Sequence, residues 1–324
     1  MAARISVIVP VRDRRDLLAA TLRALDAQTV RDFEVVVVDD GSTDGADELA
    51  ATAVVAGRPV VLGRTGGAGA VAARTTGVAL ASAPLLAFTD SDCEPEPQWL
   101  EQALAALEGG AALAHGPTVP ARSVRPLERS VSERDGGLFP TCNIAVRREV
   151  LEAVGGFDVA AARRWRFRPT DRAQGLGFGE DTLFGWRVAR SHGVRFVPEM
   201  VVRHHVFPPD LRDWLSRSVQ AAAFPALVRE VPELRGTMVH HGVLFTHRSR
   251  VPVYATAVAV LTRRPALVAG TAAWWALHRY RHTIRPTDLS RPAKVRAVPA
   301  QMLLDVVQAG ALVVGSARAR TLLL

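Results

Sequence analysis

Short apolar runs alternate with amphipathic segments along the first 200 residues of the chain. The runs Ile5–Val11, Phe33–Val38 and Leu85–Phe88 are continuous in their apolar character, which is typical of strands buried on both faces of a parallel sheet. The segment after the first run carries its buried-type residues on one helical face, at Leu17, Leu18, Thr21, Leu22 and Leu25. This alternation predicts an α/β fold in which helices flank a mostly parallel sheet.

Turn and capping residues place the remaining elements. We expect Asp13 to cap the first helix, and Ser42 or Asp44 to cap a second helix that runs to Ala56. The segment Ala162–Gly179 is predicted to be a long surface loop, and such loops are often lids. Further strands are predicted at Val60–Leu62, Asn143–Val146 and Val194–Val197, and further helices at Gly66–Ala81, Trp99–Leu107, Arg148–Val154 and from Glu180 onward.

Pairs of carboxylates follow two of these strands. Asp39 and Asp40 come after the second strand, and Asp90 and Asp92 come after the strand Leu85–Phe88. Ligands of parallel α/β sheets bind beyond the carboxyl ends of the strands. Residues two apart in an extended backbone point the same way, and hard oxygen ligands suit Mg²⁺ or Mn²⁺. The four aspartates therefore predict one shared site, in which Asp90 and Asp92 are the pair expected to bind a divalent cation. A solvated acidic turn is the alternative explanation for the spacing of that pair.

Positive charge is concentrated in the C-terminal part of the chain. The net charge is +8, yet residues 240–324 alone carry twelve basic and two acidic side chains, while residues 1–239 carry 28 basic and 30 acidic ones. This distribution indicates that the basic character belongs to a tail that contacts a polyanion or a membrane surface. The tail contains no nucleic-acid recognition motif, so we expect no nucleic-acid partner.

The tail also contains two apolar stretches, Val251–Leu261 and Ala266–Leu277, and each is too short to span a bilayer as a helix. Trp274, Trp275 and Tyr280 lie beside arginines, a composition found at membrane interfaces. A helical hairpin packed on the rest of the protein explains the same pattern, and both interpretations stay open.

Two cysteines, Cys93 and Cys142, are too few for a disulfide framework and favour a reducing compartment. The apolar run at the N-terminus is too short for a signal peptide. We therefore expect a cytoplasmic protein, peripheral to the inner face of the cell membrane if the tail binds lipid.

Four motifs, taken in their order and spacing, resemble the inverting family 2 glycosyltransferases of the GT-A fold. A fifth stretch, which begins at Asn143, resembles the segment between the metal motif and the catalytic acid of that family. The similarity extends from about residue 4 to residue 207. The four motifs are SVIVPVRDR from Ser6, VVVVDDGSTD from Val35, Asp90-Ser91-Asp92, and GEDTLFGWRV from Gly179.

The resemblance implies a GT-A catalytic domain over residues 1–208 and a basic, partly apolar helical extension over residues 209–324. It implies transfer of a sugar from a nucleotide-diphosphate sugar, with a UDP-sugar favoured, to a hydroxyl of a glycan or a lipid-linked acceptor. Such transfer would serve cell-surface glycan or glycolipid synthesis. The expected cofactor is Mn²⁺ or Mg²⁺.

The resemblance also assigns roles to individual residues. Asp40 would accept a hydrogen bond from the base, Asp90 would lie near the ribose and on the metal side, and Asp92 would bind the metal directly. The full set of expected nucleotide contacts is Pro10, Asp39, Asp40, Arg74 and Asp90. For Asp39 and Asp40, turn formation and helix capping are the alternative roles. The resemblance supports a nucleotide contact from Arg74 less strongly, because Thr75 replaces the asparagine that often follows this arginine in the family.

Three further assignments concern the acceptor and the metal. Asp181 resembles the general base that deprotonates the acceptor hydroxyl. Glu180 beside it would orient the acceptor, or would simply favour the positive N-terminus of a helix. His204 matches a metal-side histidine of the family, with His205 as the alternative if the register shifts by one residue.

Three other interpretations compete with this one. Gly67-Ala68-Gly69 lies between a strand and a helix, about 20 residues before Asp90, which also fits an NAD-dependent oxidoreductase. A sugar nucleotidyltransferase would pair a similar sheet with acidic metal ligands, but the stretch Pro10–Arg15 lacks the glycine-rich loop that such enzymes carry. A non-catalytic binding relative would not need Asp40, Asp92 and Asp181 together.

Overall fold

The computed structural model describes residues 2–158, 179–240, 243–245 and 250–324. These residues form two compact units. Unit 1 contains residues 2–121, 130–158 and 179–205, and unit 2 contains residues 122–129 and the described residues from 206 to 324. The loop predicted for Ala162–Gly179 lies outside the described residues except for Gly179.

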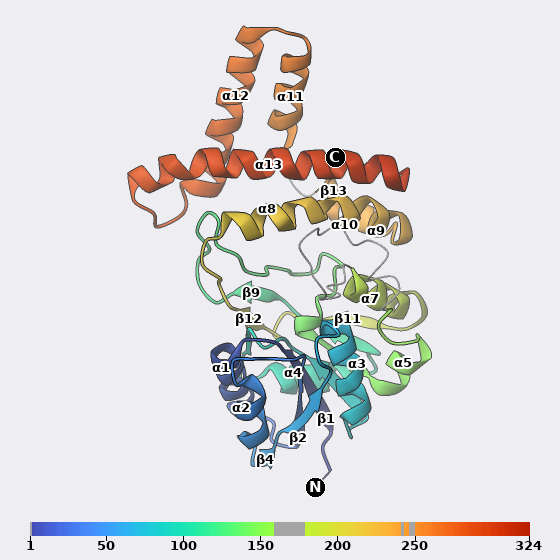
Figure 1. The fold of residues 1–324 in the computed structure, drawn as a ribbon. Coiled ribbons are helices and arrows are strands. Elements are labelled where there is room, and N and C mark those ends of the chain that lie inside the picture. Colours follow the sequence, from blue (N-terminus) through green and yellow to red (C-terminus); the bar gives the residue numbers. More distant parts are fainter. Residues whose placement is uncertain (1, 159–178, 241–242, 246–249) are drawn as a thin grey trace. The chain divides into compact units, whose positions relative to one another are not determined.

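A seven-stranded sheet forms the centre of unit 1, in the order β11-β8-β10-β6-β1-β2-β5 (Figure 1). Neighbouring strands are parallel, except that β10 runs antiparallel to both β6 and β8. The prediction of a mostly parallel α/β sheet is confirmed. The strands are β1 (Ile5–Val11), β2 (Phe33–Asp39), β5 (Val61–Arg64), β6 (Leu85–Phe88), β8 (Leu113–His115), β10 (Ile144–Arg147) and β11 (Val194–Phe196).

Helices cover both faces of this sheet, and this explains why the central strands are apolar throughout. In β2, Val35 and Val37 pack into one core cluster while Val36 and Val38 pack into the other. Side chains alternate between the two faces of a strand, so both faces need apolar residues. The first cluster includes side chains of α1 (Arg15–Asp26), α2 (Ala46–Thr52) and α4 (Trp99–Glu108), and the second includes side chains of α3 (Ala70–Leu80), α5 (Arg148–Ala153) and α7 (Glu180–Ser191).

Three strands that follow β6 in the chain form a smaller sheet with the order β7-β12-β9. Its strands are β7 (Cys93–Pro95), β9 (Thr118–Pro120) and β12 (Val202–His204). Strand β12 pairs antiparallel with β7, and this pairing sets His204 opposite Cys93. The small sheet therefore brings a histidine from late in unit 1 beside the Asp90-Ser91-Asp92 segment.

The predicted cap of the first helix by Asp13 is wrong, whereas the predicted cap of the second helix by Asp44 is confirmed. The Asp13 carboxylate does not cap α1; it accepts hydrogen bonds from the backbone N–H and the hydroxyl of Thr43. Asp44 takes the capping role for two helices, because Oδ2 accepts from the N–H of Arg15 at 2.8 Å and Oδ1 accepts from the N–H of Ala46 at 3.1 Å. The loops that follow β1 and β2 are thus hydrogen-bonded to each other.

The second helix also ends earlier than predicted. Helix α2 stops at Thr52, and the residues that follow form a two-stranded hairpin of β3 (Val54–Val55) and β4 (Arg58–Pro59). Ala56 has a φ of +54° and Gly57 a φ of +74°. These left-handed conformations suit a tight hairpin turn and cannot continue a helix.

Unit 2 is mostly helical. A hairpin of α11 (Arg250–Leu261) and α12 (Pro265–Arg279) packs at its base on the long helix α13 (Arg291–Ala319), which also contacts α8, α9 and η2 (Figure 1). Asp305 of α13 is buried and accepts hydrogen bonds from Trp275 and Arg279 of α12. The other elements are α8 (Leu211–Gln220), η2 (Ala221–Ala223), α9 (Phe224–Glu230), α10 (Leu234–Met238), β13 (Val239–His240), β14 (Leu244–Phe245) and the π-helical turn η3 (Tyr280–Ile284).

Among the described helices, α13 has the length and apolar composition of a membrane span, with 29 residues and a mean hydropathy of 1.6 in its most apolar window. Of that window, 22% is buried within the structure. Length and composition are weak evidence for a span, because core helices of soluble proteins share them. The long helix itself was not anticipated from the sequence pattern.

We predict that Asp44→Ala lowers the free energy of unfolding by about 1–2 kcal/mol, because loss of an N-cap typically costs that much and Asp44 serves two helices. Urea denaturation followed by circular dichroism measures the change. Asp16→Ala is the matched control, since its side chain is 96% exposed at the same end of α1. Equal losses in the two variants would contradict the double cap.

Candidate active site

The ends of β1 and β2 carry the first part of the site. Val11 and Asp39 are register partners at these ends, and Asp40 follows with only 5% of its surface exposed. The Asp40 carboxylate accepts hydrogen bonds from the Thr65 hydroxyl at 2.7 Å and from the N–H groups of Gly67 and Gly69 at 3.0 and 2.9 Å. Asp40 therefore holds the loop between β5 and α3 against the end of β2.

This bonding weighs against the dinucleotide alternative. A dinucleotide-binding loop directs its backbone N–H groups at a pyrophosphate. Here the N–H groups of Gly67 and Gly69 donate to the Asp40 carboxylate instead. A protein carboxylate already occupies the position that the ligand's phosphate would need.

Asp39 forms the turn that follows β2. Its carboxylate accepts from the N–H of Gly41 at 3.1 Å and from the N–H of Ser42 at 3.2 Å, and Gly41 has a φ of +83°. The turn-forming alternative that the sequence left open for Asp39 is thus present. The nucleotide contacts expected of Asp39, Asp40 and Pro10 stay predictions.

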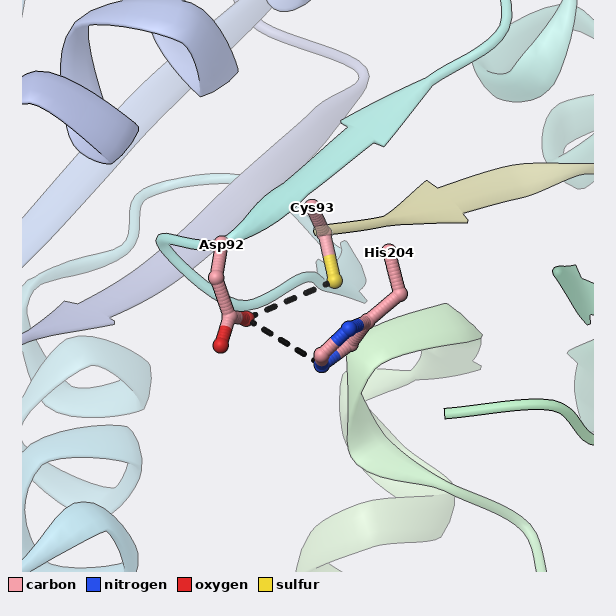
Figure 2. A group of neighbouring side chains, drawn as sticks. All are labelled: Asp92, Cys93 and His204. Carbon is pink, nitrogen blue, oxygen red and sulfur yellow. Dashed lines mark hydrogen bonds and ion pairs between the residues drawn. The ribbon is translucent and has the colours of Figure 1, made fainter. Parts of the chain in front are cut away.

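Asp92, Cys93 and His204 form a compact buried cluster (Figure 2). Asp92 Oδ1 lies 3.6 Å from His204 Nε2 and 3.7 Å from Cys93 Sγ. The side chains of Asp92 and His204 are each 4% exposed. The other carboxylate oxygen, Oδ2, accepts a hydrogen bond from the Arg14 guanidinium.

The hydrogen bonds of His204 leave one nitrogen facing Asp92. Nδ1 lies 2.7 Å from the carbonyl oxygen of His205, which requires a proton on Nδ1. Nε2 then carries the lone pair that a metal would use, and a backbone carbonyl on the other ring nitrogen is the usual arrangement for a metal-binding histidine. His205 contributes its main chain, donating its N–H to the Asp92 carbonyl at 2.8 Å.

The donor set fits a hard divalent cation at Asp92 and His204. A carboxylate oxygen suits Mn²⁺ or Mg²⁺, and a neutral imidazole is the commonest metal ligand in proteins. A thiolate would favour softer metals, but a hydrogen bond with Cys142 and burial raise the pKa of the Cys93 thiol well above its ordinary value. This shift favours the protonated form of the Cys93 thiol.

Asp90 lies outside this cluster and faces α3. Its carboxylate accepts from Arg74 at 2.7 Å, and Arg74 also lies 4.0 Å from the Glu180 carboxylate. Burial lowers the pKa of Arg74, but the charges of Asp90 and Glu180 more than offset this, and the pKa is raised overall. Arg74 thus links the carboxylates after β6 to those at the start of α7, and the metal contact expected of Asp90 stays a prediction.

Helix α7 begins directly after Gly179, which has a φ of +75°, and Asp181 is the second residue of the helix. Its Oδ1 accepts from the N–H of Thr182 at 2.8 Å. Burial and the neighbouring charge of Glu180 raise the pKa of Asp181 from 3.8 to about 7. A carboxylate with that pKa is well suited to accept a proton near neutral pH.

The start of α7 is fixed by the loop before β10. The Thr182 hydroxyl donates to the Leu138 carbonyl at 2.8 Å, and Trp186 Nε1 donates to the Gly137 carbonyl at 2.9 Å. Gly185 must lack a side chain, because a Cβ there would lie 2.2 Å from the ring of Phe139. These contacts hold Asp181 and Glu180 in place.

Cys93 and Arg14 are neighbours of Asp92 that the sequence pattern did not indicate. Cys93 directly follows Asp92, but an adjacent residue in a strand points to the other side, so spacing alone did not suggest it. Arg14 is part of the Arg12-Asp13-Arg14 motif, whose first residue lies 3.9 Å from Asp40 Oδ2. The basic side chains of this motif, directly after the first strand, are the feature of the sequence from which these arginine–aspartate contacts could have been predicted.

Comparison with known proteins identifies the family of the chain. The model of the family described as "Glycosyl transferase family 2" matches residues 6–157. Glycosyltransferase AglE of Haloferax volcanii is 33% identical over 210 residues, which cover 58% of this chain and 68% of AglE. The chain therefore belongs to glycosyltransferase family 2.

Other relatives are matched over smaller parts of their length. Validoxylamine A glucosyltransferase of Streptomyces hygroscopicus subsp. jinggangensis is 42% identical over 110 residues, which cover 33% of this chain and 26% of the relative. Pre-mycofactocin glycosyltransferase of Mycobacterium tuberculosis is 26% identical, over 74% of this chain and 51% of the relative. The chain thus spans between about a quarter and two thirds of the length of these three relatives.

Solved structures show the same fold. The mannosyltransferase PcManGT from Pyrobaculum calidifontis, in complex with GDP-Man and Mn²⁺, has a TM-score of 0.55 at 18% identity, over 99% of this chain and 88% of that one. Residues 1–349 of S. aureus TarS, in complex with UDP-GlcNAc, have a TM-score of 0.50 at 14% identity, over 99% and 93% of the two chains. The GT-A fold expected from the sequence is confirmed.

The raised pKa of Asp181 predicts a pH-dependent change in stability. The stability contributed by the neutral carboxyl group is complete at low pH and is lost as the pH rises from 3.8 through about 7. Asp181→Asn is neutral at every pH, so its thermal unfolding midpoint should exceed that of wild type at pH 8 by more than at pH 5. Differential scanning fluorimetry measures both differences.

The matched control for this measurement is Asp16→Asn, whose side chain is 96% exposed. It should show no comparable growth of the difference between pH 5 and pH 8. A stability gain in Asp181→Asn that is the same at both pH values would contradict the raised pKa.

Proposed function

We propose that the protein transfers a sugar from a nucleotide-diphosphate sugar to an acceptor hydroxyl with inversion at the anomeric carbon. The observation that carries this proposal is a continuous series of contacts in unit 1. It runs from the His204–Asp92 pair, through Asp90 two residues earlier and its partner Arg74, to the Glu180-Asp181 pair. These contacts support a single site that contains both the metal-side carboxylate and the proton-accepting carboxylate.

The proposed reaction transfers one proton and exchanges one bond at the anomeric carbon. The Asp181 carboxylate takes the proton of the acceptor hydroxyl, and the hydroxyl oxygen attacks the anomeric carbon from the face opposite the diphosphate. The bond from that carbon to the diphosphate oxygen breaks, and its electron pair leaves with the nucleoside diphosphate. A single displacement inverts the configuration, and one base is sufficient because the donor carries its own leaving group.

We propose that Asp92 and His204 hold the divalent cation, Mn²⁺ or Mg²⁺. When bound, this cation would neutralise the charge that develops on the departing diphosphate. The solved complex of PcManGT with GDP-Man and Mn²⁺ supports a nucleotide-sugar donor and a divalent cation. The assignment to this chain rests on the arrangement of Asp92 and His204.

We assign the nucleotide to the edge formed by β1, β2 and β6, with a UDP-sugar favoured. An ionised carboxylate offers about four acceptor positions, and three protein donors bond to Asp40. In the proposed role, Asp40 would also accept a hydrogen bond from an N–H of the base. The catalytic domain would comprise residues 1–208 and the helical extension residues 209–324.

We also propose that unit 2 contacts the inner face of the cell membrane, where a glycan or lipid-linked acceptor would be found. Thirteen of the sixteen large, exposed apolar side chains in the described residues lie between 251 and 322, which makes this the most apolar surface of those residues. The outer part of the α11–α12 hairpin exposes residues such as Val258, Val260, Leu261 and Leu267.

The charges of this region favour an anionic surface. The two acidic residues beyond position 240 are both paired, Asp288 with Arg125 and Asp305 with Arg279. Arg263 and Arg264, which join α11 to α12, are exposed. Exposed apolar residues beside uncompensated arginines are the composition of interfacial membrane segments.

The first prediction from this proposal separates the two acids at the start of α7. Asp181→Asn should lower turnover by about 10²–10⁴-fold, the usual cost of losing a general base, and Glu180→Gln should lower it much less. Wild-type turnover should rise with pH up to about 7 and then level off, because Asp181 must be ionised to accept a proton. Initial rates of nucleoside diphosphate release measure these effects, and a greater loss in Glu180→Gln would make Glu180 the base.

The second prediction concerns the membrane. Replacing Leu261 and Leu267 together by glutamate should reduce co-sedimentation with phosphatidylglycerol vesicles by about tenfold or more, because two apolar side chains leave the interface and two repelling charges enter it. The matched control replaces Val54 and Leu80 of unit 1, which are 60% and 42% exposed, by glutamate. High salt should weaken wild-type binding. Equal sedimentation of the two double variants would refute contact through the hairpin.

A further inference from the structure

Three aspartates at the carboxyl edge of the central sheet each face an arginine, in the pairs Arg12–Asp40, Arg74–Asp90 and Arg14–Asp92. Two of these arginines belong to the Arg12-Asp13-Arg14 segment, which directly follows β1. Because β1 lies between β2 and β6 in the sheet, residues after it can reach the carboxylates that follow either neighbour. The proposed reaction assigns no role to this segment.

The Arg14–Asp92 pair bears directly on cation binding. Asp92 Oδ2 accepts from the Arg14 guanidinium, while Oδ1 faces His204 Nε2. The Asp92 side chain is 4% exposed, and that of Arg14 is 35% exposed. The carboxylate of the cluster therefore already has a full positive countercharge from the protein.

This countercharge opposes a divalent cation that binds alone. A cation between Asp92 Oδ1 and His204 Nε2 would lie close to the Arg14 guanidinium, and like charges at such distances repel strongly at a largely buried site. Within the cluster of described residues, Asp92 is the one carboxylate. Asp90 nearby is paired with Arg74. Mg²⁺-type cations at such sites usually obtain their remaining negative ligands from substrate phosphates.

We propose that Arg14 makes cation binding depend on the nucleoside diphosphate. In the free protein Arg14 neutralises Asp92. When the diphosphate binds, its phosphates supply the missing negative charge, and Arg14 gains a second anionic partner beside Asp92. This inference rests on the proposed function, because it takes Asp92 and His204 as the cation ligands.

The coupling must act in both directions. If the diphosphate strengthens cation binding, the cation strengthens diphosphate binding by the same factor. Arg14 therefore keeps the site from holding a cation without a donor. It acts through Asp92 and the diphosphate, and it takes no part in proton transfer.

The test measures binding of Mn²⁺ alone, by the loss of the free-ion signal in electron paramagnetic resonance as protein is added. Arg14→Ala and Arg14→Gln should bind Mn²⁺ about tenfold or more tightly than wild type, a size typical of coupling between sites. Arg14→Lys keeps the charge and should resemble wild type. Arg15→Ala is the matched control, because Arg15 is the next residue, is 54% exposed and faces Asp16.

A double variant separates the proposed role of Arg14 from the proposed cation site at Asp92. The gain should disappear when Asp92→Asn is added to Arg14→Gln, because Asp92 is the ligand that Arg14 opposes. Unchanged or weaker Mn²⁺ binding in both Arg14→Ala and Arg14→Gln would overturn the role of Arg14 and leave the proposed transfer reaction standing. A gain that survives Asp92→Asn would overturn the proposed cation site itself.

Discussion

Unit 1 depends on balancing the negative charge that collects at the carboxyl edge of its sheet. Parallel strands end at the same edge, so Asp39, Asp40 and Asp92 are brought together there and are almost completely buried. Burying a carboxylate is costly unless it is paired or hydrogen-bonded. The protein meets this requirement in two ways: backbone N–H groups surround Asp39, and arginines face the carboxylates of the other strand ends.

Asp181 is placed in the opposite kind of environment. No arginine donates a hydrogen bond to it among the described residues, and burial together with the charge of Glu180 raises its pKa to about 7. The carboxylates that follow β2 and β6 accept hydrogen bonds from backbone N–H groups or from arginines, whereas Asp181 has a pKa suited to proton exchange near neutral pH. Environments that differ in this way let carboxylates of one site serve different purposes. In the proposed function, they would separate the cation-binding group Asp92 from the base Asp181.

Local sequence patterns predicted the features that depend on one strand or helix. The apolar runs identified β1, β2 and β6 because both faces of those strands are buried, and the Asp90-Ser91-Asp92 spacing marked a strand end. His204 was preferred to His205, and the structure brings the His204 ring to Asp92 while His205 contributes its backbone. Alternation along β12 explains this difference.

Features that depend on contacts between distant segments could not be predicted in this way. Arg14 and Asp92 are 78 residues apart in the chain, and Asp44 caps α1 through a loop contact 29 residues away. The antiparallel direction of β10 is set by its neighbours β6 and β8, since its own four residues would fit either direction. In α13, apolar residues are spread around the helix and Pro299 lies inside it, so no amphipathic stripe indicated its length.

The central claim is that Asp92 and His204 hold the cation that accompanies the donor. Crystals grown with Mn²⁺ and a nucleoside diphosphate, measured at the manganese absorption edge, test it most directly. We expect an anomalous peak between Asp92 Oδ1 and His204 Nε2, in contact with the diphosphate and with the Arg14 side chain close by. A manganese peak elsewhere, with Asp92 still bonded to Arg14 and the diphosphate away from both, would contradict the account.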